Sequence, residues 1–105
     1  MHFTSFLENG RLTVALTGEI DHHCAKGYIN AIAAKIEAYT PEICVLDFTE
    51  VTFMDSSGIA VVINAMRDMK ALGGTLLVEQ IGPQPMRVFR ASGIDQLVEI
   101  REAVL

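Results

Sequence analysis

The chain has 105 residues, a formal net charge of −5 and 50% hydrophobic residues. A length of about 100 residues indicates a single domain, and this apolar content excludes an intrinsically disordered chain. The acidic balance argues against a nucleic-acid-binding protein, because such proteins usually carry a basic face.

The lack of targeting signals and the setting of the two cysteines predict a cytoplasmic protein. The N-terminal residues show no basic segment followed by an apolar core, so we expect no signal peptide. No apolar run approaches the ~20 residues that a transmembrane helix needs, and we expect no membrane association. Cys24 and Cys44 each lie in an apolar stretch. We therefore expect two reduced, buried thiols.

The first elements form a predicted β-hairpin. Residues 11–17 alternate apolar and polar side chains, which is typical of a strand with one buried face. Asn9-Gly10 just before them is typical of a two-residue hairpin turn, so residues 3–7 are the expected partner strand. Gly18 breaks the alternation, and we expect the second strand to end there.

A helix and a central strand follow the hairpin. Apolar residues recur at every fourth position, at Cys24, Tyr28, Ile32 and Ile36. Asp21 is the predicted N-cap of this helix, which ends before Pro41. Residues 43–48 are a short apolar run, typical of a strand buried on both faces. The helix between them predicts that this strand runs parallel to the preceding one.

The second half of the chain continues the alternation of helices and strands. We expect a helix over residues 59–72 that ends at Gly73-Gly74, and a strand over residues 75–79. A short helix with Pro85 in its first turn is expected to stop at Ser92-Gly93. Residues 97–100 are a brief strand candidate, and Glu102 is the expected start of a last helix.

These elements predict an α/β fold. Their order is β-β-α-β-α-β-α-β-α, with a four- to five-stranded mixed sheet and helices packed against it. The sheet should be largely parallel, with one antiparallel hairpin at its start.

The motif that stands out is Asp55-Ser56-Ser57-Gly58, at the predicted turn from a strand into a helix. Aspartate and serine are ordinary helix caps, which is the simplest interpretation. A serine hydrolase would need a glycine-flanked nucleophile and a histidine base, and neither is evident. We therefore predict no catalytic residue and no enzymatic activity.

The sequence predicts no cofactor, metal or small-molecule substrate. It lacks a phosphate-binding loop ending in Lys-Ser/Thr and a dinucleotide-binding glycine motif. The pair His22-His23 would point in directions about 100° apart on a helix. Surface histidines at a helix start are therefore favoured over a metal site.

A phosphoacceptor is the second interpretation of the serine motif. A hydroxyl at a helix N-terminus is exposed and held in one place, and phosphorylation adds about −1.5 to −2 charges. The helix amides can hold that charge without unfolding of the domain.

Several motifs together resemble the anti-sigma factor antagonists of the STAS domain family. They lie in the expected order over nearly the whole chain: residues 16–23 (Leu-Thr-Gly-Glu-Ile-Asp-His-His), 45–48 (Val-Leu-Asp-Phe), 53–59 (Phe-Met-Asp-Ser-Ser-Gly-Ile), Gly73-Gly74 and 89–94 (Phe-Arg-Ala-Ser-Gly-Ile). The resemblance implies that residues 1–105 are a single STAS domain.

The resemblance also implies a mechanism and a set of site residues. In that bacterial family, an anti-sigma factor that is also a serine kinase phosphorylates one serine, which matches Ser57 here. The unphosphorylated antagonist binds the anti-sigma factor and frees the sigma factor, and a serine phosphatase resets the cycle. The partner-binding residues implied by position are Glu19, Asp21, Asp55, Ser56, Ser57 and Gly58.

Two functions are therefore expected from the resemblance. The first is a phospho-switched binding module that regulates transcription by partner switching. The alternative is a STAS regulatory or scaffold subunit of a stress-sensing, transporter or lipid-trafficking complex, without a phospho-switch, in which Ser57 only caps the helix.

Overall fold

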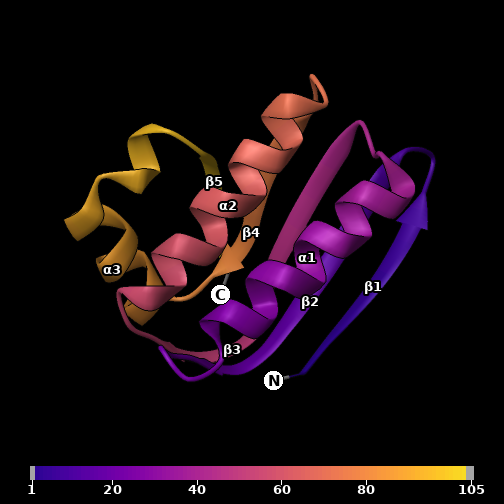
Figure 1. The fold of residues 1–105 in the computed structure, drawn as a ribbon. Helices are drawn as coiled ribbons and strands as arrows, with labels where there is room; N and C mark the ends of the chain where they lie inside the picture. Colours follow the sequence, from indigo (N-terminus) through magenta and orange to yellow (C-terminus); the bar gives the residue numbers. More distant parts are fainter. Residues whose placement is uncertain (1, 104–105) are drawn as a thin grey trace.

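The computed structural model describes residues 2–103, which form one α/β domain with a five-stranded mixed sheet (Figure 1). The elements in chain order are β1 (His2–Glu8), β2 (Arg11–Ile20), α1 (Ala25–Tyr39), β3 (Ile43–Met54), α2 (Ser57–Ala71), β4 (Thr75–Ile81), α3 (Pro83–Ser92), the 3₁₀ helix η1 (Ile94–Gln96) and β5 (Glu99–Glu102). The sheet order is β1-β2-β3-β4-β5. β1 is antiparallel to β2, and the remaining pairs are parallel. The predicted fold class and central strand are confirmed.

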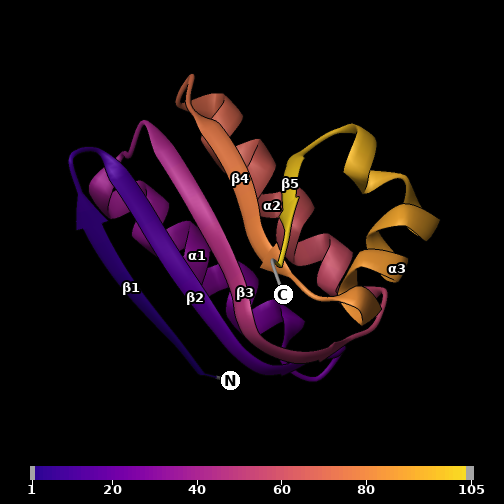
Figure 2. The ribbon, with the colours of Figure 1, turned by 180° about the vertical axis from the view of Figure 1, so that it is seen from behind.

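The helices α1 and α2 lie side by side over one face of the sheet, and the other face is open (Figures 1 and 2). The alternation in β2 explains this arrangement, because Leu12, Val14 and Leu16 are fully buried on the helix side. Tyr28 of α1 is buried against them, and its hydroxyl oxygen lies 2.9 Å from the carbonyl oxygens of both His2 and Thr17. One side chain therefore connects α1 to β1 and β2.

Within residues 2–103, only side chains cover the open face. Val45 of β3 and Leu77 of β4 are paired across the strands on this face, and both are buried. The guanidinium of Arg11 reaches from β2 across β3 to the carboxylate of Glu79 on β4, at 3.1 Å. Arg101 of β5 approaches the same carboxylate at 3.5 Å. An ion-paired layer thus shields the apolar middle of this face.

The structure corrects four predicted element boundaries. β3 continues to Met54, six residues beyond its predicted end. Gly18 does not end β2: it lies within the strand at φ +83°, next to a register shift in the pairing with β3. α1 begins at Ala25 with Cys24 as its N-cap, so Asp21 does not cap the helix itself. Glu102, the expected start of a last helix, is the final residue of β5, and residues 104–105 lie outside the described residues.

The two cysteines differ in their surroundings. Both are free thiols, but only Cys44 is buried, whereas Cys24 is half-buried, so the prediction of two buried thiols is wrong for Cys24. Burial raises the pKa of the Cys44 thiol to about 12, so this group stays protonated at neutral pH. In the described part of the chain, no helix is both long and apolar enough to cross a membrane.

Candidate functional site

The candidate site lies where β2 and β3 end side by side. Ile20 and Met54 are register partners at the carboxyl ends of these parallel strands, and the N–H of Asp55 donates to the carbonyl oxygen of Ile20 at 3.2 Å. The turn that follows β2 therefore lies beside the turn that follows β3. This arrangement brings the predicted residues Glu19 and Asp21 next to residues 55–58.

The turn after β3 holds its serines through Asp55. The Oδ1 atom of Asp55 accepts the backbone N–H of Ser57 at 2.8 Å, and its carbonyl oxygen accepts the N–H of Gly58 at 3.1 Å. Ser56 is exposed, and Ser57 is half-buried as the first residue of α2. The side chain of Ser56, at the N-cap position, makes no capping hydrogen bond. Asp55 thus orders the turn without using the hydroxyl group of either serine.

Gly58 lets α2 begin directly against the ends of the two strands. Gly58 is buried, and a Cβ atom at this position would meet the side chain of Met54 and lie 3.3 Å from Cγ2 of Ile20. Met54 is itself fully buried, so a larger residue would force the start of α2 away from the sheet. The glycine of the motif is therefore explained by packing, and it fixes where Ser57 lies.

Gln84 of α3 is a site residue that the sequence did not reveal. Its Oε1 atom accepts the N–H of Met54 at 2.8 Å, and its Nε2 atom donates to the carbonyl oxygen of Met54 at 2.8 Å. The pairing of β3 with β4 ends earlier, at Asp47 and Glu79. The side-chain amide therefore takes the place of a strand partner just before the serine turn. A glutamine in the first turn of a helix is not a sequence signal for this contact.

Asp21 orders the turn after β2 in a similar way. Its Oδ1 atom accepts the backbone N–H groups of His23 at 2.9 Å and of Cys24 at 3.3 Å. Partial desolvation favours a higher pKa for Asp21. These hydrogen bonds and the His23 ring, 3.7 Å from Oδ2, favour a lower pKa, and their combined effect is larger than that of desolvation. The pKa of Asp21 is therefore lowered below its ordinary value, and the carboxylate is charged at neutral pH.

The two histidines are exposed and lie in the turn before α1, with ring centroids 3.9 Å apart. Among residues 2–103, no three or more histidine, cysteine, aspartate and glutamate side chains are grouped so as to hold a metal ion.

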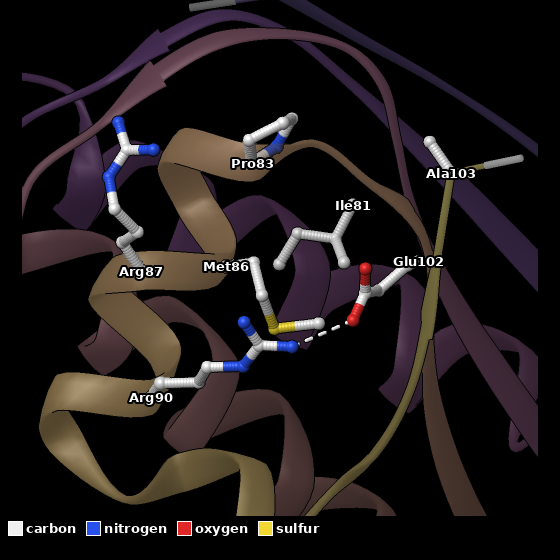
Figure 3. Close-up of a pocket in the computed structure, with 7 residues that line it drawn as sticks. All are labelled: Ile81, Pro83, Met86, Arg87, Arg90, Glu102 and Ala103. Carbon is white, nitrogen blue, oxygen red and sulfur yellow. Dashed lines mark hydrogen bonds and ion pairs between the residues drawn. The ribbon is translucent and has the colours of Figure 1, made fainter. Parts of the chain in front are cut away.

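A pocket of about 260 Å³ lies beside α3, and its lining includes none of the predicted site residues (Figure 3). Arg90 and Glu102 form a salt bridge at 2.8 Å within it. The lining consists of Ile81, Pro83, Met86, Arg87, Arg90, Glu102 and Ala103. The candidate site at the end of the sheet is therefore separate from this pocket.

The side chains of the site suit two tasks: the Ser57 hydroxyl can accept a transferred group, and the surrounding surface can contact another protein. Ser57 offers a hydroxyl group at a helix start, where backbone N–H groups favour an added anion. Glu19, Asp21 and Asp55 provide acidic groups nearby, and Phe53, the register partner of Glu19, has 42% of its surface exposed. An exposed aromatic ring beside charged groups is typical of a protein-binding surface.

Comparison with known proteins identifies the family. The family model of the STAS domain matches residues 7–104, so the chain belongs to the STAS domain family. A relative from Lysinibacillus sphaericus, named an anti-sigma F factor antagonist, is 30% identical over 95 residues. The match covers 90% of this chain and 81% of the relative.

Solved structures of similar fold include both states of one phosphoprotein. The anti-sigma factor antagonist SpoIIAA in its unphosphorylated form matches with a TM-score of 0.81 and 26% identity, over 94% of this chain and 87% of that chain. SpoIIAA of Bacillus in its phosphorylated form matches with a TM-score of 0.72 and 26% identity, over 94% and 90%.

Proposed function

We propose that this protein is an anti-sigma factor antagonist that is switched by phosphorylation of Ser57. In the unphosphorylated form it binds an anti-sigma factor and frees the sigma factor. The geometry of Ser57 carries this proposal: the residue starts α2, its N–H is held by Asp55 at 2.8 Å, and the hydroxyl is not needed to order the turn. The names of the similar proteins support the same function.

The proposed partners follow from the chemistry of the switch. The anti-sigma factor acts as the serine kinase and supplies ATP, metal and base, while a serine phosphatase resets the cycle. This chain supplies an acceptor hydroxyl and a binding surface, formed by Glu19, Asp21 and residues 55–58. It acts by binding and not by catalysis, in the cytoplasm.

Charge alone is sufficient to release the partner. A phosphate placed about 4 Å from a partner carboxylate costs about 4 kcal/mol per pair of unit charges at an effective dielectric constant near 20. This cost corresponds to a loss of affinity on the order of a thousandfold. Because the added charge lies at the helix start, the domain does not need to change its fold.

The decisive experiment uses the two adjacent serines as a matched pair. The protein is incubated with the candidate kinase and ATP, and its intact mass is measured. We expect one added phosphate on the wild-type protein and on Ser56→Ala, and none on Ser57→Ala. Phosphorylation of Ser57→Ala to the wild-type extent would contradict the assignment. Absence of phosphate on all three proteins would favour a scaffold subunit.

Binding measurements with the same variants test the switch itself. Ser57→Ala should bind the anti-sigma factor and resist release when ATP is added. Ser57→Asp should weaken binding only in part, because a carboxylate carries less charge and bulk than a phosphate. Equal affinity of the phosphorylated and unphosphorylated proteins for the partner would refute the proposed switch.

A further inference from the structure

The two edges of the sheet differ in how they are protected against pairing. β5 is four residues long and includes Glu99, Arg101 and Glu102, as expected of an edge that avoids other strands. β1 is seven residues long, and residues 3–7 (Phe-Thr-Ser-Phe-Leu) contain no charge, proline or glycine. This edge lacks the usual features that prevent strand addition.

The unpaired backbone groups of β1 can be identified from its hairpin. Asn9 and Gly10 both have positive φ, as a type I′ two-residue turn requires, so Glu8 and Arg11 form the closing hydrogen-bonded pair. Every second residue of β1 therefore bonds to β2. The position of the His2 carbonyl oxygen agrees with this pattern. It lies 2.9 Å from the Tyr28 hydroxyl oxygen, which lies at the same distance from the carbonyl oxygen of Thr17 on β2. The N–H and C=O groups of the intervening residues, Phe3, Ser5 and Leu7, face outward.

Two apolar side chains of β1 also remain uncovered. Phe6 has 59% and Leu7 has 45% of its surface exposed, on opposite faces of the strand. β1 lies at the outer edge of the sheet, beyond α1 (Figure 1). Another strand can therefore approach this edge without meeting the helix layer.

We propose that the edge of β1 pairs with β1 of a second copy of this chain, antiparallel and centred on Ser5. In this register Ser5 faces Ser5, Phe3 faces Leu7, and Thr4 faces Phe6 of the other copy. The outward N–H and C=O groups of Phe3, Ser5 and Leu7 then bond to one another. Both exposed apolar side chains, Phe6 and Leu7, gain a cross-strand neighbour.

The charge pattern of β1 supports a second copy as the occupant. The same register places His2 of one copy opposite Glu8 of the other, twice, so that each carboxylate faces an imidazole N–H donor and no like charges meet. The contact is isologous and closes after two copies, which joins the two sheets into one of ten strands. One strand edge is a small interface, so we expect a reversible dimer that forms at high protein concentration.

Proline substitution separates this pairing from folding. The N–H of Ser5 points away from β2, so Ser5→Pro keeps the β1–β2 hydrogen bonds. It removes the backbone N–H at the centre of the proposed β1–β1 pairing from both copies. Ser5→Ala is the matched control, because it keeps the N–H group. Sedimentation is measured in ~0.15 M salt from about 10 µM to about 1 mM protein, the range in which small interfaces associate. Circular dichroism verifies that each variant is folded.

We expect the wild-type protein and Ser5→Ala to approach twice the 11.5 kDa monomer mass as concentration rises. Ser5→Pro should raise the dissociation constant at least about tenfold. A wild-type mass that stays at 11.5 kDa overturns the proposal. Equal association by Ser5→Pro, or growth beyond two copies, overturns it as well.

Cross-linking tests the register and does not depend on Ser5→Pro folding. Facing residues of a hydrogen-bonded pair have Cα atoms about 5.5 Å apart, within the range of a disulfide. With oxidised glutathione as the electron acceptor, Ser5→Cys should form a covalent dimer, and Gln96→Cys, exposed in η1, should not. A Ser5→Cys protein that remains monomeric overturns the proposed register. Dimerisation is independent of Ser57, so Ser5→Pro should be phosphorylated as the wild type is.

Discussion

At the scale of single residues, the two aspartates of the site perform the same local task. Asp21 follows β2 and accepts the N–H of His23, and Asp55 follows β3 and accepts the N–H of Ser57. In each case the acceptor lies two residues before the donor, which is typical of an Asx turn. Two adjacent parallel strands therefore end in the same type of turn. This repetition explains why both aspartates matter for the shape of the candidate binding surface.

The lowered pKa of Asp21 predicts how Asp21→Asn depends on pH. Because the carboxylate has a lower pKa in the folded state, its contribution to stability is fully present above the ordinary value of 3.8. That contribution is lost as the pH falls through the folded pKa. We expect Asp21→Asn to be less stable than the wild type at pH 7, and this difference to shrink below about pH 3.8.

Urea unfolding at a series of pH values measures this difference. Asparagine can still accept the N–H of His23 through its side-chain oxygen, so the comparison isolates the charge. A difference in unfolding free energy that stays constant down to pH 2 would contradict a lowered pKa at Asp21.

At the scale of elements, α3 completes the edge of β3 that β4 leaves free. The amide of Gln84 makes two hydrogen bonds of 2.8 Å to the backbone of Met54, one residue before the serine motif. Gln84→Leu would leave both backbone groups of Met54 without this partner, in a half-buried place. We expect a loss of about 2 kcal/mol in unfolding free energy.

Hydrogen exchange of the Met54 amide distinguishes this contact from a general loss of packing. In Gln84→Leu that amide should exchange faster, while the amide of Leu46, in the fully paired part of β3, should change only with global stability. Gln96→Leu, at an exposed position in η1, is the matched control and should lie within about 0.5 kcal/mol of the wild type. Unchanged protection of Met54 would show that Gln84 is not its partner in solution.

The elements also show what could be predicted from the sequence. Residues 43–48 were identifiable as a central strand because a run of apolar side chains is buried on both faces. The rest of β3 was missed because Thr49, Glu50 and Thr52 interrupt that run, although Glu50, Val51, Phe53 and Met54 still pair with β2. Gly18 was misjudged because a bulge accommodates its positive φ within the strand.

The candidate site was partly predictable for a similar reason. Asp55, Ser56, Ser57 and Gly58 are adjacent in sequence, so a local motif can reveal them. The contact of Gln84 joins residues 30 positions apart through a side chain. No local pattern of apolar or capping residues encodes such a contact.

At the scale of the whole molecule, the open face of the sheet depends on charged side chains for its cover. Val45 has 1% of its surface exposed although none of the helices in the described part of the chain packs on that face. The side chain of Arg11 crosses β3 to reach Glu79. We attribute the burial of Val45 in part to the aliphatic stem of Arg11. Arg11→Ala should therefore destabilise the fold by about 1 kcal/mol through lost packing.

Salt dependence separates packing from ion pairing. If packing dominates, the loss in Arg11→Ala should persist in about 1 M NaCl, where exposed ion pairs are screened. Arg101→Ala removes a 60% exposed side chain that approaches the same carboxylate, and it should change stability by less than about 0.5 kcal/mol. Equal losses in the two variants that both vanish in high salt would refute a packing role for Arg11.

The contact between Gln84 and Met54 has a consequence for the order of events during synthesis. The serine turn emerges from the ribosome before α3, and the glutamine that fixes the end of β3 follows 30 residues later. A nascent chain that ends before α3 therefore presents Ser57 beside an incomplete strand end. If Ser57 is the phosphoacceptor that we propose, we expect a kinase that recognises the completed strand end to act on the finished protein and not on the nascent chain.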